Sequence, residues 1–172
     1  MSIDKDFVFP VYIESMVLNR IIELCKNSSK EIFGYLIGSI LRWNEELYVI
    51  IEEQLFIKGA IHSDQYSTSQ IEGKAGEYER EFQKFKRLKK NSNLRVLGWW
   101  HSHPGLGCFL SPVDLKTQKF FFPEKYQIAL VIDPANSKYK FFTLDVNTRM
   151  KYKEISHAVI SSTKKVDLKK MS

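Results

Sequence analysis

Three potential metal ligands lie close together in the segment Gly98 to Asp114, which reads GWWHSHPGLGCFLSPVD. His101 and His103 are two residues apart, so on a β-strand their imidazoles point to the same side and can meet at one ion. Asp114 follows a short glycine-containing loop and lies in the first turn of an expected helix. Two imidazoles and one carboxylate suit a single Zn²⁺ ion and leave a fourth position for water, as in catalytic zinc sites.

Two further residues can assist hydrolysis at such a site. Glu31 begins the apolar segment EIFGYLIG, and a carboxylate there is costly unless it has a partner or a task. We expect Glu31 to act as a general base that takes a proton from the attacking water and passes it to the leaving amine. The alternative is an ion pair with a nearby lysine. The hydroxyl of Ser111 can donate a hydrogen bond to an oxyanion or can simply cap the helix that follows.

The elements that must position these residues are predicted from hydrophobic periodicity and turn residues. Strands are predicted at residues 7–13, 31–41, 47–57, 94–100, 126–132 and 138–144, and a last strand, with a short helix as a further option, is predicted after about residue 155. Helices are predicted at 18–25, 76–88 and 112–121, and loops at 58–69 and 104–110. The pattern indicates a mixed α/β (α+β) domain built around one sheet.

Local signals mark where several of these elements begin. Ser15 and Ser111 are predicted N-caps, the latter followed by proline at the first helical position. The strand at 31–41 is almost entirely apolar, which predicts burial on both faces. Gly34 and Gly38 within it predict close approach of a neighbouring backbone.

Composition bounds the function classes. The chain has 172 residues, 44% of them hydrophobic, and two cysteines, which fits one domain without a disulfide framework. We find no signal peptide and no apolar run long enough to span a bilayer, and we expect a cytoplasmic protein. The net charge of +6 is concentrated at residues 84–90 and 164–170. We interpret these lysines as a solvated surface and do not expect a nucleic-acid partner.

The combination of residues resembles the JAMM (MPN+) motif, which consists of a distant Glu, then His-x-His, ten residues and Asp. Here these are Glu31, His101, His103 and Asp114. EIFGYLIG resembles the family's Glu strand, GWWHSHPG its metal strand and SPVD its Ser-x-x-Asp. The similarity extends over about residues 7–145.

The resemblance implies an MPN (cytidine-deaminase-like) domain with a central mixed β-sheet flanked by helices. It implies one Zn²⁺ held by the two histidines and the aspartate, Glu31 as general acid/base and Ser111 as oxyanion donor. The implied activity is a deubiquitinase-like isopeptidase, which cuts after the C-terminal glycines of ubiquitin or a ubiquitin-like modifier. The alternative within the family is a non-catalytic MPN scaffold subunit of a larger complex.

The segment GLGCFLS is most similar to the proteasome-lid and signalosome members of the family. A second zinc, as in the endosomal AMSH group, is not expected because no cysteine follows Asp114 and His157 is the one later histidine. The long C-terminal helical extension of the complex subunits is missing from the sequence, which favours a stand-alone prokaryotic member. The resemblance also raises an MPN–MPN dimer or an activating partner as expected assemblies.

Three residues near the motif, Trp100, Cys108 and Phe109, are predicted to contact substrate. Cys108 is interpreted as a groove-lining residue rather than a nucleophile. Residues 58–93 are predicted to help hold an extended substrate tail by β-augmentation. The predicted domain organisation is an extension at 1–6, the MPN domain at 7–155 and a basic tail at 156–172.

Overall fold

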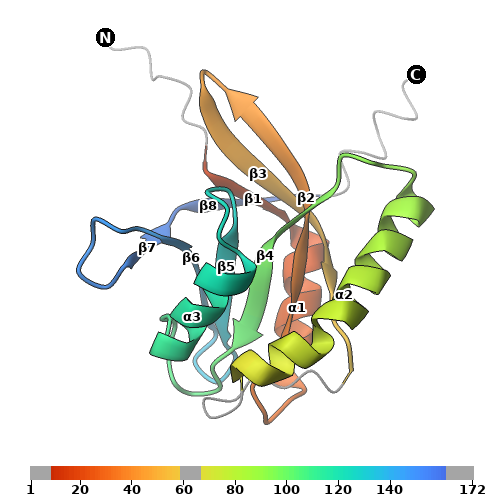
Figure 1. Cartoon of the computed structure of the whole chain (residues 1–172). Coiled ribbons are helices and arrows are strands. Elements are labelled where there is room, and N and C mark those ends of the chain that lie inside the picture. Colours follow the sequence, from red (N-terminus) through yellow and green to blue (C-terminus); the bar gives the residue numbers. More distant parts are fainter. Residues whose placement is uncertain (1–8, 59–66, 162–172) are drawn as a thin grey trace.

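An eight-stranded sheet runs through the part of the chain that the computed structural model describes, residues 9–58 and 67–161 (Figure 1). Within residues 67–73 only the backbone is described. The elements in chain order are β1 (Val11–Glu14), α1 (Ser15–Lys26), β2 (Phe33–Trp43), β3 (Glu46–Leu55), α2 (Ser67–Lys89), β4 (Arg95–Ser102), α3 (Pro112–Phe121), β5 (Ile128–Asp133), β6 (Lys138–Leu144), β7 (Tyr152–Ile155) and β8 (His157–Ile160).

The sheet is mixed, with the strand order β7-β6-β5-β4-β2-β3-β1-β8. β4, which carries the histidines, lies near the centre, where it pairs antiparallel with β2 and parallel with β5. β1 pairs parallel with both β3 and β8, and the other neighbouring strands are antiparallel. The predicted mixed α/β fold around one sheet is confirmed.

Helices cover both faces of the sheet, with α1 on one side and α2 and α3 on the other (Figure 1). Val17 and Ile21 of α1 pack against the face that includes Trp100. On the opposite face, Tyr78 of α2 stacks on Tyr35 with ring centroids 4.4 Å apart, and its hydroxyl donates to the backbone carbonyl of Phe33 at 2.8 Å. The predicted apolar face of α2 therefore packs on the protein's own sheet.

A β-bulge in β4 changes the side of the sheet on which Leu97 lies. Leu36 of β2 pairs with Gly98 while the next residue, Ile37, pairs with Val96, so Leu97 is an extra residue in β4. Gly98 has φ of 139°, a conformation that favours glycine. Leu97 consequently lies in the α1-side core although it is two residues from Trp99, which packs on the α2 and α3 side.

Close backbone contact at the two glycines of β2 agrees with the prediction. A Cβ atom on Gly34 would meet the carbonyl of Leu55 and the ring of Trp100, and one on Gly38 would meet the carbonyl of Ile50. Bulkier residues cannot replace them without moving a neighbouring strand. This packing keeps β2 between β3 and β4, which places the start of β2 beside the histidines.

The beginnings of the first two helices differ from the predictions. Glu14 lies at the N-cap of α1 without a side-chain cap bond, and Ser15 is the first helical residue. β1 turns directly into the helix, so no position is left for a serine cap. The backbone of α2 is helical from Ser67, so the loop predicted at 58–69 is wrong at its C-terminal end, while residues 59–66, His62 among them, lie outside the described residues. Gly76 and the polar residues before it obscured this first part of the helix.

The C-terminal part of the sheet also differs. β7 was not predicted, because two of its four residues are exposed and charged. β8 lies where a last strand was predicted, and it pairs with β1, so the sheet continues beyond residue 155. No helix in the described ranges is long and apolar enough to cross a membrane.

Candidate metal centre

The three predicted ligands meet where β4 ends and α3 begins. The Nε2 atom of His101 lies 3.3 Å from Oδ2 of Asp114, and the Nε2 atom of His103 lies 3.2 Å from the same oxygen. All three potential ligand atoms lie within 4.8 Å of one another. The side chains of His101 and Asp114 are fully buried and that of His103 is 3% exposed. Nitrogen and carboxylate donors gathered in this way fit one Zn²⁺ ion.

A capping box at the start of α3 fixes the Asp114 carboxylate. The backbone N–H of Ser111 donates to Oδ2 of Asp114 at 2.8 Å, and the backbone N–H of Asp114 donates to Oγ of Ser111 at 3.1 Å. The cap uses an oxygen lone pair of Ser111, so the hydroxyl hydrogen can still be donated to another group. The two roles considered for Ser111 are therefore compatible.

His103 is oriented by the loop that follows it. Its Nδ1 atom lies 3.2 Å from the backbone carbonyl oxygen of Gly107, which requires the hydrogen on Nδ1 and directs Nε2 toward Asp114. Burial lowers the pKa of His103, but the hydrogen bond and charge of Asp114 and the charge of Glu31 together raise it above its usual value. Glu31 and Asp114 thus both act electrostatically on His103.

His101 is held by its neighbours in the layer between the sheet and the helices. Its ring stacks on Trp99 with centroids 4.1 Å apart and lies 4.9 Å from the ring of His103. A ring that is packed on both sides has little rotational freedom. The packing therefore presents His101 to the site in one orientation.

Glu31 is brought to the site by the pairing of β2 with β4. Phe33 lies opposite His101 in the sheet register. The backbone N–H of Ile32 donates to Oγ of Ser102 at 3.0 Å, and the backbone N–H of Ser102 donates to the carbonyl of Ile32 at 3.0 Å. These bonds fix the half-buried Glu31 just before the start of β2, next to the histidines.

The three predicted substrate contacts have different surroundings. Phe109 is 39% exposed and its ring centroid lies 4.8 Å from that of His103, so it borders the site. Cys108 is half-buried, and burial raises the pKa of its thiol, which disfavours a thiolate nucleophile. The prediction for Trp100 is wrong, because its side chain is fully buried in the core on the α1 side of the sheet, the face opposite to His101.

One carboxylate beside the site was missed from the sequence. Asp133 ends β5 and is fully buried. Its Oδ1 accepts from the backbone N–H of Gly105 and its Oδ2 from that of Gly107, both at 2.9 Å. In the sequence, Asp133 falls between the strands predicted at 126–132 and 138–144, where an acidic residue is typical of a turn. The available signal was an acidic residue at the end of a buried strand that runs parallel to the histidine strand, so that both ends meet at one sheet edge.

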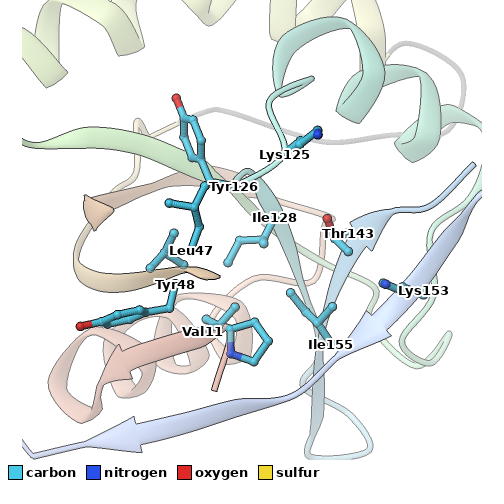
Figure 2. Close-up of a pocket in the computed structure, with 11 residues that line it drawn as sticks. Val11, Leu47, Tyr48, Lys125, Tyr126, Ile128, Thr143, Lys153 and Ile155 are labelled. Carbon is cyan, nitrogen blue, oxygen red and sulfur yellow. The ribbon is translucent and has the colours of Figure 1, made fainter. Parts of the chain in front are cut away.

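A pocket at the opposite end of the sheet is separate from this site (Figure 2). Its apolar lining includes Val11 at the start of β1 and Ile128 at the start of β5. Lys153 also lines it and forms an ion pair with Asp145 at 3.5 Å. The pocket shares no lining residue with the metal centre, and the chemistry of the His-x-His segment does not extend to it.

The sequence matches the model of the family described as JAB1/Mov34/MPN/PAD-1 ubiquitin protease over residues 7–125. The chain is 27% identical over 151 residues to COP9 signalosome complex subunit 5 of Candida glabrata, which covers 80% of this chain and 30% of that protein. It is 30% identical over 137 residues to the same subunit of Candida albicans, covering 78% of this chain and 22% of that protein.

A shorter match of higher identity is to ubiquitin carboxyl-terminal hydrolase RPN11 of Saccharomyces cerevisiae, with 54% identity over 43 residues, 24% of this chain and 14% of that protein. The chain thus spans less than a third of the length of each of these relatives. The family model, in contrast, covers more than half of this chain. The protein belongs to the JAB1/Mov34/MPN/PAD-1 ubiquitin protease family, close to the members that are subunits of the COP9 signalosome and the 26S proteasome.

Proposed function

We propose that the protein is a zinc-dependent isopeptidase that hydrolyses the bond after the C-terminal glycines of ubiquitin or a ubiquitin-like modifier. The observation that carries this proposal is the buried cluster of His101, His103 and Asp114, on which the charge of Glu31 also acts. The ligand set is complete, and the relative from Saccharomyces cerevisiae is named as a ubiquitin hydrolase.

The site residues take distinct roles in this proposal. His101, His103 and Asp114 would hold the ion, which when bound acts as a Lewis acid that makes water a nucleophile at neutral pH. Glu31, just before the start of β2, takes the proton from the attacking water and transfers it to the leaving amine. Ser111 donates its hydroxyl hydrogen to the oxyanion that develops on the scissile carbonyl.

Substrate binding involves the exposed side of the loop between β4 and α3. Leu106 and Phe109 expose 58% and 39% of their surface next to His103, and Cys108 lies between them in sequence. An extended diglycine tail can approach such a surface closely because glycine has no side chain. A second MPN copy or an activating partner also belongs to the proposal, supported by relatives that are named as subunits of complexes. A cytoplasmic location is proposed as well.

The test uses zinc-loaded protein and ubiquitin that carries a short C-terminal extension, with products identified by intact mass. We expect the wild type to cleave after the terminal glycines. The variant Glu31→Gln should bind one zinc and lose cleavage by at least about 100-fold, because it lacks the proton acceptor. Glu23→Gln, a matched change at an exposed position of α1, should cleave like the wild type.

The scaffold alternative makes a different prediction. A non-catalytic subunit would cleave neither the extended ubiquitin nor an extended form of another ubiquitin-like modifier, with or without zinc. Equal cleavage by the wild type and Glu31→Gln would exclude Glu31 as the base. The variant Asp114→Asn, treated with a chelator to remove zinc, should not cleave. Cleavage under these conditions would exclude the proposed metal site.

A further inference from the structure

The Asp133 carboxylate binds the loop that connects the two histidines at the end of β4 with Asp114 at the start of α3. Gly105 and Gly107 each donate a backbone N–H to a different oxygen of this carboxylate, at 2.9 Å. Asn136 adds its backbone N–H to Oδ1 at 3.3 Å and its side-chain amide to Oδ2 at 2.6 Å. Each carboxylate oxygen therefore binds one loop amide and one group of the β5–β6 turn.

The same loop controls the orientation of His103. The backbone N–H of Gly107 donates to Asp133, and the carbonyl of Gly107, in the next peptide unit, accepts from Nδ1 of His103 at 3.2 Å. The backbone of His103 is fixed too, because its N–H donates to the carbonyl of Ile132 at 2.8 Å. Gly105 and Gly107 have φ of 76° and 87°, so this course of the loop favours glycine at both positions.

We propose that Asp133 is a positioning residue for His103, which acts through Gly107 to keep the hydrogen on Nδ1 and the lone pair of Nε2 directed into the metal centre. A contribution of Asp133 to catalysis rests on the proposed function. The hydrogen-bond chain itself is independent of any substrate. A partner that orients a ligating histidine commonly contributes about 10- to 100-fold in metal affinity.

Substitution of Asp133 by asparagine separates this role from simple packing. The amide keeps the size of the side chain, but one of its two ends is an NH₂ group that meets an N–H donor of the loop. One of the two glycine anchors is lost whichever way the amide is turned, and the loop that holds the Gly107 carbonyl toward His103 is loosened. We expect zinc affinity, measured by competition with a chelator, to fall by about 10- to 100-fold.

A second readout reports on the histidine directly. In the zinc-loaded protein, the Nδ1 proton of His103, followed by ¹⁵N NMR, should exchange with water at least about 10-fold faster in Asp133→Asn than in the wild type. The matched control is Asp145→Asn, since Asp145 accepts a backbone N–H from Asn147 at 2.9 Å in the β6–β7 turn. This control should change neither zinc affinity nor the exchange of the Nδ1 proton.

The outcomes are distinct. A lower thermal midpoint in Asp133→Asn, together with wild-type zinc affinity and wild-type exchange of the Nδ1 proton, would overturn the proposal and leave Asp133 a structural residue. If the variant does not fold, the wild type decides, because the proposal requires a slowly exchanging Nδ1 proton with scalar coupling to the Gly107 carbonyl. Neither measurement uses a substrate, so a failed cleavage assay would count against the proposed function alone.

Discussion

At the scale of single residues, Ser111 combines a structural and a chemical role in one hydroxyl. Its oxygen accepts the backbone N–H of Asp114 and so begins α3, while its hydrogen can be donated toward the site. Substitutions that remove the hydroxyl affect helix stability to different degrees. Alanine at an N-cap costs about 0.5–2 kcal/mol, whereas glycine costs only a few tenths.

This difference yields a prediction for two variants. Ser111→Ala should lower the free energy of unfolding by about 1 kcal/mol, and Ser111→Gly by much less. Both should reduce kcat by a similar factor, on the order of 100-fold, because both lack the oxyanion donor. Urea unfolding and steady-state cleavage of extended ubiquitin measure the two effects separately. If kcat followed stability, with Ser111→Gly near the wild-type rate, the role of Ser111 would be the cap alone.

At the scale of elements, the bulge in β4 interrupts the alternation of side chains and places Leu97 on the same side of the sheet as Trp100. Trp99 and His101 face α2 and α3, while Leu97 and Trp100 fill the core under α1. Gly98 makes this possible, since its backbone has a positive φ and lies against the carbonyl of Ile128 in β5. A Cβ atom at this position would collide with that carbonyl.

Gly98→Ala should therefore destabilise the fold by about 2–3 kcal/mol or more, through backbone strain and displacement of β5. Gly76→Ala is the contrasting variant. Gly76 is exposed within α2, and among the described side chains a Cβ there would meet the Arg80 guanidinium at 4.0 Å and nothing nearer. It should stabilise the protein by up to about 1 kcal/mol. Denaturant unfolding of both variants checks the pair, and equal effects would contradict the described course of β4.

At the scale of the whole molecule, the last described strand, β8, forms one edge of the sheet beside β1. β8 pairs in parallel with β1 over four residues, from His157 opposite Val11 to Ile160 opposite Glu14. The ring of His157 also reaches β6, where its Nε2 lies 3.1 Å from the Tyr139 hydroxyl. The sheet therefore depends on residues that the sequence analysis assigned to a tail.

A truncation pair tests this dependence. A chain that ends at residue 155 should be less stable than one that ends at residue 161, by about 2–4 kcal/mol, because several strand hydrogen bonds of about 1 kcal/mol each are lost. Thermal unfolding of the two chains gives the comparison. Equal midpoints would support the domain boundary predicted at residue 155.

Much of the site was already determined by the sequence, because it depends on local geometry. The spacing of His101 and His103 places both rings on one side of the backbone wherever that segment is extended. Ser111 and Pro112 begin a helix by bonds within three residues, which carries Asp114 in its first turn. Such features need no knowledge of distant parts of the chain.

The tertiary structure decided what depends on contacts between distant segments. Asp133 and the loop it binds are 26 and 28 residues apart, and Glu31 reaches the site through a hydrogen bond between residues 70 apart. The side of the sheet on which Leu97 lies follows from a bulge that hydrophobic periodicity does not reveal. Periodicity and spacing describe how one segment can fold, whereas the pairing of strands determines which segments meet.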